Sequence, residues 1–205
     1  MNNIYMISSY RLGDLVLLDN LTHFEENQIL TEHPDSIGSK YILQKKYDNR
    51  INNIDLITKI VMENIEQSLD LLPKNITEST VIHLRLGDVI AGNELHEKLK
   101  RPLEVNHIKS LVADDNNPKY VIGKCFFAKT SSKNYEECIT LSNEYLQNVI
   151  NELDAKYFNS GIADIDLYCA IKSKIFIQGR GYFSKLIVEI RKKLNLKSIE
   201  TTTHD

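Results

Sequence analysis

The sequence predicts an α/β protein built around a mainly parallel sheet. Short runs rich in Val, Ile and Phe alternate along the chain with longer stretches whose apolar residues recur at helical spacing. Several of these runs also stop at a glycine that precedes a predicted helix. Alternation of this kind favours strands joined by helical crossovers, because parallel neighbours need a long connection between them.

The first part of the chain is expected to hold two short strands, a turn and two helices. Residues 3–9 form an apolar run, RLGD (11–14) reads as a tight turn, and LVLLDNLTHF (15–24) has helical spacing. A short strand is expected near 41–43. The stripe of apolar residues over 54–72 predicts a helix, and Pro73 ends it because proline cannot continue a helix.

The second part contains the clearest strands and helices. We expect strands over 79–87, 120–128 and 174–179, and helices over 131–158, 165–171 and 181–194. Ser or Asn residues are available to cap the helix over 131–158. The connection over 89–118 is polar and is expected to be irregular, with a turn at DDNNP (114–118). A boundary between 78 and 79 would divide the chain into two lobes, 1–78 and 79–205.

Composition is that of a soluble globular protein, with 42% hydrophobic and 26% charged residues and a net charge of −3. Residues 1–78 carry 7 Lys/Arg against 12 Asp/Glu, whereas residues 79–205 carry 18 against 16. The second lobe is therefore the better place for an anionic ligand, and nothing favours nucleic acid or a membrane surface as partner. Without a basic leader, a long apolar span or paired cysteines, we expect a reduced, cytoplasmic protein with no membrane span and no structural zinc.

Three predicted strand ends carry residues suited to an anion. They are Arg11-Leu-Gly-Asp14, His83-Leu-Arg-Leu-Gly-Asp88 and Gly179-Arg-Gly-Tyr-Phe-Ser184. In parallel α/β sheets ligands bind beyond the carboxyl ends of strands, where glycine admits close backbone approach and helix N-termini favour anions. An arginine can bind two phosphate oxygens at once, and a serine in the first helical turn can add a further contact. Together these residues predict a diphosphate pocket.

Structural explanations exist for each of these residues. Arg85 and Asp88 can form an ion pair that only stabilises a turn, and the two interpretations are evenly balanced. A single histidine such as His83 is more often hydrogen-bonded in a core than catalytic. Ser184 taken alone is more often a helix-start residue, and Gly179 with Gly181 can simply form a tight turn.

Other phosphate, metal and nucleophile motifs do not occur in the sequence. It contains no GxxxxGK[ST] loop, no GxGxxG after the first strand, no histidine pair at helical zinc spacing and no GxSxG elbow. Its basic residues are not interleaved with the aromatic platform typical of single-strand nucleic-acid binders.

Three motifs, in order along the chain, resemble the fucosyltransferase-like GT-B glycosyltransferases, the group of α-1,2- and α-1,6-fucosyltransferases and protein O-fucosyltransferases. His83-Leu-Arg85 resembles their His-x-Arg motif, and DLYCAIKSKIFIQGRGYFSKLI (166–187) is similar to their C-terminal motif. YRLGDL (10–15) resembles the loop after their first strand, with Asp14 in place of an Asn. The resemblance implies Rossmann-like parallel sheets in a reduced two-lobe GT-B architecture, with 1–78 on the acceptor side and 79–205 binding the nucleotide sugar.

The resemblance also implies roles for individual residues. Arg85 would contact the β-phosphate and the glycosidic oxygen of the donor, Ser184 and its backbone N–H would hold the same diphosphate, and Asp166 would position the nucleoside. His83 would line the donor pocket. The remaining donor-binding residues would be Gly87, Asp88, Gly181 and Phe183. Asp14 would act as general base for the acceptor hydroxyl, or it is only a turn residue.

The function expected from this resemblance is sugar transfer from a nucleotide diphosphate donor to a glycan acceptor, inverting and without a metal or other cofactor. GDP-fucose is one possible donor, although Leu86 stands where many members carry a second Arg, so the base and the sugar stay open. A homo-oligomer or a partner protein could complete the acceptor site of so short a chain. The alternative is a non-catalytic module of the same fold that binds a nucleotide or a glycan.

Overall fold

The chain forms an α/β unit around one parallel sheet. The computed structural model describes residues 4–5, 16–17, 54–90, 101–126, 135–161 and 163–201. The central sheet has five strands in the spatial order β7-β5-β3-β8-β9, and all four pairings are parallel. Their bounds are β3 Thr80–His83, β5 Lys119–Ile122, β7 Lys156–Tyr157, β8 Ile175–Ile177 and β9 Ser198–Ile199.

The strand order is that of a Rossmann-type sheet. Numbered as they follow one another in the chain, the five strands lie in the order 3-2-1-4-5. The first strand of this sheet, β3, lies in its middle. The chain then adds β5 and β7 on one side of β3, and β8 and β9 on the other. The expected α/β fold with Rossmann-like parallel strands is therefore confirmed for the described residues.

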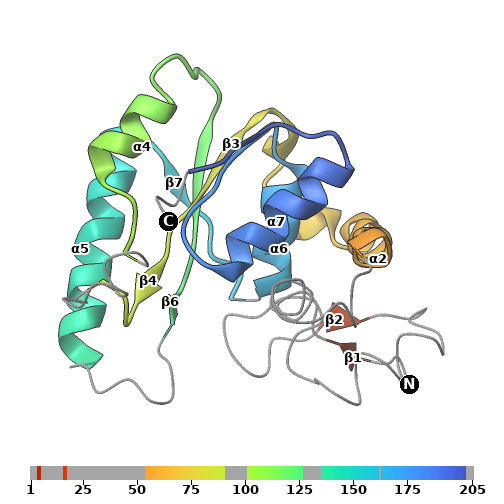
Figure 1. Cartoon of the computed structure of the whole chain (residues 1–205), viewed down its shortest axis with the longest axis horizontal. Coiled ribbons are helices and arrows are strands. Elements are labelled where there is room, and N and C mark those ends of the chain that lie inside the picture. The colour runs from red at the N-terminus through yellow and green to blue at the C-terminus, as the bar shows by residue number, and fades with distance from the viewer. Residues whose placement is uncertain are drawn as a thin grey trace.

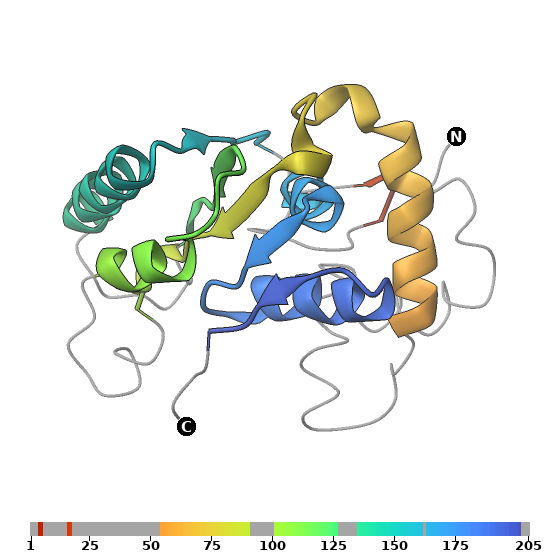
Figure 2. The same cartoon turned by 90° about the horizontal axis from the view of Figure 1, so that it is seen from above.

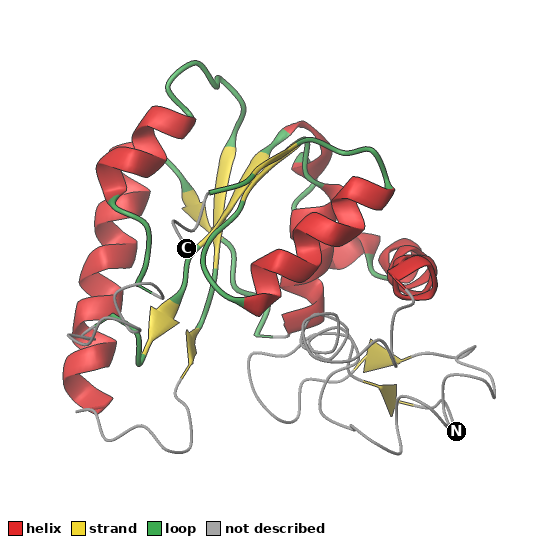
Figure 3. Cartoon of the chain, viewed as in Figure 1, coloured by secondary structure: helices red, strands yellow, loops and turns green. Residues whose placement is uncertain are grey.

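Helices cover both faces of this sheet (Figures 1 and 3). One face is covered by α4 Val105–Leu111 and α5 Tyr135–Leu153, and the other by α6 Ala163–Lys172 and α7 Tyr182–Lys193. Side chains alternate between the faces: Val81 packs with the α6/α7 core, and its neighbour Ile82 packs with the α4/α5 core. This burial on both sides explains why the strands read as continuous apolar runs.

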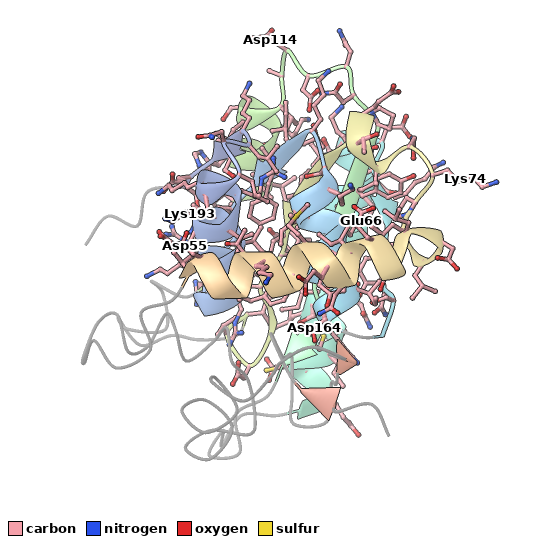
Figure 4. All side chains as sticks on the ribbon, turned by 90° about the vertical axis from the view of Figure 1, so that its right-hand side faces the viewer. Asp55, Glu66, Lys74, Asp114, Asp164 and Lys193 are labelled. Atoms are coloured by element: carbon pink, nitrogen blue, oxygen red, sulfur yellow. The ribbon has the colours of Figure 1, made fainter. Side chains whose placement is uncertain are left out.

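A further helix, α2 Ile54–Gln67, packs across α7 on the same side of the sheet (Figure 2). Its residues Ile54, Val61 and Ile65 enter the α6/α7 core, and their spacing places them on one helical face. An ion pair between Asp55 and Lys193, with 2.9 Å between Oδ1 and Nζ, joins the two helices at one end (Figure 4).

Arg191 in the last turn of α7 is a buried structural residue. Its guanidinium donates hydrogen bonds to the carbonyl oxygens of Ala170 (2.7 Å), Ile171 (2.9 Å) and Ser173 (2.9 Å), and it also reaches the carbonyl of Lys197. It thereby supplies donors for the carbonyl groups that α6 leaves unpaired at its end. Burial lowers the pKa of Arg191 to about 10.

Most predicted elements are confirmed, with corrections. Residues 16–17, expected in a helix, form β2 Val16–Leu17, which pairs antiparallel with β1 Ile4–Tyr5. The connection over 89–118 contains α4, because Ile108 and its apolar neighbours pack against α5. The run over 120–128 divides into β5 and β6 Cys125–Phe126, since Gly123 has a φ of +143°.

The ends of two other elements also differ from expectation. The helix over 131–158 stops at Leu153, and Lys156–Tyr157 form β7 because they pair beside β5. The strand over 79–87 likewise divides into β3 and β4 Leu86–Gly87. β9 was not predicted. The strand near 41–43 and most of the proposed 1–78 lobe lie outside the described residues, so the boundary at 78 stays a prediction.

Candidate functional site

The candidate site lies at the carboxyl ends of β3 and β8, where the strand order reverses. Along the chain β3 is the first strand of this sheet and β8 the fourth, but in the sheet they lie side by side. The chain leaves β3 toward the α4/α5 face and leaves β8 toward the α6/α7 face, so the two connections diverge. In open α/β sheets this divergence opens a crevice at the edge, which is the usual place for a ligand.

Arg85 and the start of α7 meet at this point. Arg85 follows β3 by two residues, and Gly181 is the N-cap of α7 with a φ of +96°. A Cβ atom placed on Gly181 would lie 3.9 Å from Cδ of Arg85, so the arginine side chain runs beside the glycine backbone. The structure therefore brings a guanidinium to the N-terminus of a 12-residue helix, whose first N–H groups carry partial positive charge.

The Arg85 side chain is 28% exposed and lies 3.8 Å from a carboxylate oxygen of Asp88. Burial lowers the pKa of Arg85, and the Asp88 carboxylate acts in the opposite direction. The predicted ion pair is thus present, at a distance that is long for a hydrogen bond. The guanidinium carries five N–H donors in a planar arrangement, which suits it to oxygen-rich partners.

His83 is held tightly between the β3 and β8 strand ends. A Cβ atom on Gly179 would lie 2.2 Å from the carbonyl oxygen of His83 and 2.6 Å from its Nδ1, so no larger residue fits there. The imidazole also lies against the ring of Phe183, with 5.2 Å between the ring centroids. His83 and Phe183 therefore pack together where β3 ends and α7 begins.

The environment of His83 keeps its imidazole neutral. Burial, followed by the positive charge of Arg85, lowers the pKa of His83 to about 3. A group with so low a pKa is a weak proton acceptor near neutral pH, where a general base is most effective with a pKa close to the working pH. His83 is consequently suited to shaping the site and not to taking a proton.

Ser184 is fully buried in the first turn of α7. Its hydroxyl lies 2.7 Å from the carbonyl oxygen of Gly179 and 3.1 Å from that of Gly181, and it donates to this pair. The hydroxyl thus fixes the glycine loop to the helix, which is the structural role that the sequence left open. Contact between Ser184 and a phosphate stays a prediction.

Gly87 and Asp88 form the turn that follows Arg85. Gly87 has a φ of +95°, a conformation that favours glycine, and its carbonyl accepts a hydrogen bond from the N–H of Ile90 at 3.1 Å. Leu86 and Gly87 also pair with Cys125 and Phe126 in the short parallel ladder β4-β6. Gly87 and Asp88 therefore lie at the same edge of the sheet as Arg85.

Asp166 lies in the first turn of α6 and is fully buried. Its carboxylate accepts hydrogen bonds from the Ser160 hydroxyl at 2.6 Å and from the Ser160 N–H at 3.2 Å. It therefore ties the loop after β7 to α6, a contact that the sequence did not predict, and its role toward a nucleoside stays a prediction. Asp14 lies outside the described residues.

Within the described ranges, His, Cys, Asp and Glu side chains form no group of three or more that could hold a metal ion. No helix in those ranges is long and apolar enough to cross a membrane.

Comparisons with known proteins give structural neighbours only. No family model and no curated protein matches the chain. Crystal structures of POFUT1, a protein O-fucosyltransferase, align with it at low similarity. The structure with GDP has a TM-score of 0.44 and 13% identity over 86% of this chain and 57% of that one. The structure with GDP-fucose has a TM-score of 0.43 and 11% identity over 89% and 59%.

The chain thus spans less than two thirds of the length of these POFUT1 structures. Fold and site together define a Rossmann-type α/β protein with an arginine beside a helix N-terminus at its switch point.

Proposed function

We propose that this protein transfers a sugar from a nucleoside diphosphate donor, and that Arg85 and the start of α7 hold the diphosphate. The observation that supports this most directly is the placement of Arg85 beside Gly181 at the switch point of the sheet. A guanidinium and a helix N-terminus are two independent anion-binding features, and they come from strands that are far apart in sequence.

The chemistry follows from where charge develops. As the bond between the sugar and the diphosphate breaks, the bond electrons stay with the leaving phosphate oxygen and its negative charge grows. Arg85 and the N–H groups at the start of α7 stabilise that charge in place, without having to reorient during the reaction. The acceptor hydroxyl must lose its proton to a base, and the low pKa of His83 argues against that residue. We propose Asp14 for this step.

The finer assignments rest on the motif resemblance. We propose a glycan acceptor, inversion at the anomeric carbon and no metal requirement, with fucose as the first sugar to test. Gly87, Asp88, Phe183, Ser184 and Asp166 would complete the donor site around Arg85 and His83. The POFUT1 structures are described in complex with GDP and GDP-fucose, which makes guanine the first base to test.

Thermal unfolding with GDP, UDP, CMP and ADP tests the donor pocket. A ligand at one hundred times its Kd adds about 2.7 kcal/mol to the free energy of unfolding. For a protein of this size that raises Tm by roughly 5–10 °C. We expect one nucleoside diphosphate to do so in the wild type, and in the Lys197→Ala control at the opposite edge, but not in folded Arg85→Ala. If none of the nucleotides shifts Tm, the proposal is wrong.

Turnover then separates an enzyme from a binding module. Release of GDP from GDP-fucose in the presence of a mixture of glycan acceptors is measured for the wild type and for Asp14→Asn. An enzyme with Asp14 as base retains GDP affinity in this variant and loses release by roughly a hundredfold or more. Tight GDP binding without any release in the wild type would instead identify the non-catalytic module.

A further inference from the structure

Arg85 is carried by a turn that depends on a neighbouring helix. After β3, the N–H of Leu84 still bonds to the carbonyl of Ile122 at 2.8 Å, which continues the ladder between β3 and β5. Beyond this bond the neighbouring strand β5 ends before Gly123, and the chain passes through the half-buried Arg85 to Leu86 and Gly87 in β4. The position of the Arg85 side chain therefore depends on how firmly the backbone is held at Gly87, two residues further along the chain.

Ser142 supplies that fixation from α5. The Gly87 N–H donates to Oγ of Ser142 at 3.0 Å, and both Ser142 and Gly87 are buried. The two residues are 55 positions apart in the chain. Helix α5 and strand β4 pack against each other, so the hydroxyl meets the turn across a close interface.

Loss of the hydrogen bond between Gly87 and Ser142 should cost more free energy than loss of one at the surface. A buried N–H that loses its acceptor is costly, because no water replaces the lost partner. Glycine adopts many backbone conformations at little cost, so the bond to Ser142 helps to hold Gly87 at its φ of +95°. Without the hydroxyl, the Gly87 N–H loses its acceptor while the β4-β6 pairing and the bond from Ile90 remain, so the turn that carries Arg85 is held less firmly.

We propose that Ser142 is a positioning residue that holds the Arg85 turn in its ligand-binding geometry from the middle of α5. This inference rests on the proposed function, because it assigns Arg85 to the diphosphate. Ser142 itself does not contact the ligand. It acts through the Gly87 backbone. A binding group such as Arg85 needs neighbouring hydrogen bonds of this kind to keep it in its binding position.

The test compares two buried serines, Ser142 in α5 and Ser79 just before β3. Ser79 precedes β3, is fully buried and donates to the carbonyl of Asn75 at 2.6 Å, so Ser79→Ala is the matched control for Ser142→Ala. The Kd of the nucleoside diphosphate that stabilises the wild type best is measured by calorimetry at 15 °C, with folding checked by circular dichroism. We expect a Kd about tenfold higher in Ser142→Ala, equal to about 1.4 kcal/mol, and less than a twofold change in Ser79→Ala.

Two further measurements separate a positioning role from a general loss of stability. Ser142→Thr retains the hydroxyl and is expected to bind within threefold of the wild type. Hydrogen exchange of the peptide covering 84–90 is expected to be faster in Ser142→Ala and unchanged in Ser79→Ala. If Ser142→Ala does not fold, Ser142→Cys takes its place, since it is close in size but a weak acceptor.

The outcomes distinguish failure of this inference from failure of the proposed function. Equal Kd values for Ser142→Ala and Ser79→Ala overturn the role of Ser142 and leave the donor site intact. A Kd for Ser142→Thr as high as that of Ser142→Ala also overturns it, because the hydroxyl is then not responsible. A wild-type protein that binds no nucleoside diphosphate overturns the proposed function, and the positioning role with it.

Discussion

Acid should destabilise this protein through His83. The pKa of His83 is about 3 in the folded chain, mainly because the imidazole is buried, against 6.5 when it is exposed in the unfolded chain. Between these two values the unfolded chain binds a proton that the folded chain does not. The stabilising contribution of neutral His83 is therefore fully present above pH 6.5 and is lost progressively as the pH falls toward 3.

The magnitude follows from the width of that pH window. Each pH unit below 6.5 lowers the free energy of unfolding by about 1.4 kcal/mol while the folded imidazole stays neutral. Two pH units of the range from 7.5 to 4.5 lie below 6.5. Protonation of His83 in the unfolded chain should therefore lower the free energy of unfolding by about 2.7 kcal/mol over this range. This is a large share of the 5–15 kcal/mol that stabilises a typical domain.

Urea unfolding at pH 7.5 and pH 4.5 measures the effect. The wild type is compared with His83→Gln, which does not titrate, and with His107→Gln, which replaces an exposed histidine on α4. We expect the loss of stability between the two pH values to be about 2.7 kcal/mol smaller in His83→Gln than in the wild type. The comparison uses the pH difference, so any loss of packing in the variant cancels.

Two results would refute this reasoning. Equal pH dependence in the wild type and His83→Gln would mean that His83 binds its proton alike in both states. An NMR titration of the His83 ring in the folded protein with a midpoint between pH 6 and 7 would show directly that burial does not suppress its charge.

Three further substitutions probe the packing around the sheet by urea unfolding at pH 7.5. Gly179→Ala would place a Cβ atom 2.2 Å from the His83 carbonyl, so it should cost about 2–3 kcal/mol, and a cost near zero would contradict the close approach. Arg191→Met removes the donor shared by several buried carbonyls and should cost about 3 kcal/mol, whereas a neutral result would show that those carbonyls find other partners. Lys109→Met breaks a half-exposed ion pair with Glu152 and should change stability by less than about 1 kcal/mol; a larger loss would be unexpected for a solvent-screened pair.

The elements with long, regular patterns were predictable, and the short ones were not. The stripe of apolar residues over 181–194 predicted α7, because the buried face of an amphipathic helix is visible in the spacing of its apolar residues. The seven residues of α4 lie in a polar stretch, and they form a helix because Ile108 packs on α5. Helices this short depend on tertiary packing, since they are too short to be stable alone.

The candidate site was partly predictable for the same reason. Arg85, Gly181 and Ser184 were singled out because glycine, arginine and a hydroxyl at strand ends have a shared chemistry toward anions. The contact between Gly179 and His83, and the hydrogen bonds from Gly87 to Ser142 and from Ser160 to Asp166, had no local signal. Each joins residues that meet only once the strands or helices have packed.

The sequence alone determined the class of fold, the main helices and strands, and the residues at the ends of β3 and β8. These depend on hydrophobic periodicity, glycine geometry and side-chain chemistry, which act over a few residues. The tertiary structure decided the strand order 3-2-1-4-5, and with it the meeting of Arg85 and the α7 N-terminus at one edge of the sheet. It also decided that Arg191 is a buried support and that His83 is neutral, because burial and long-range contacts set both properties.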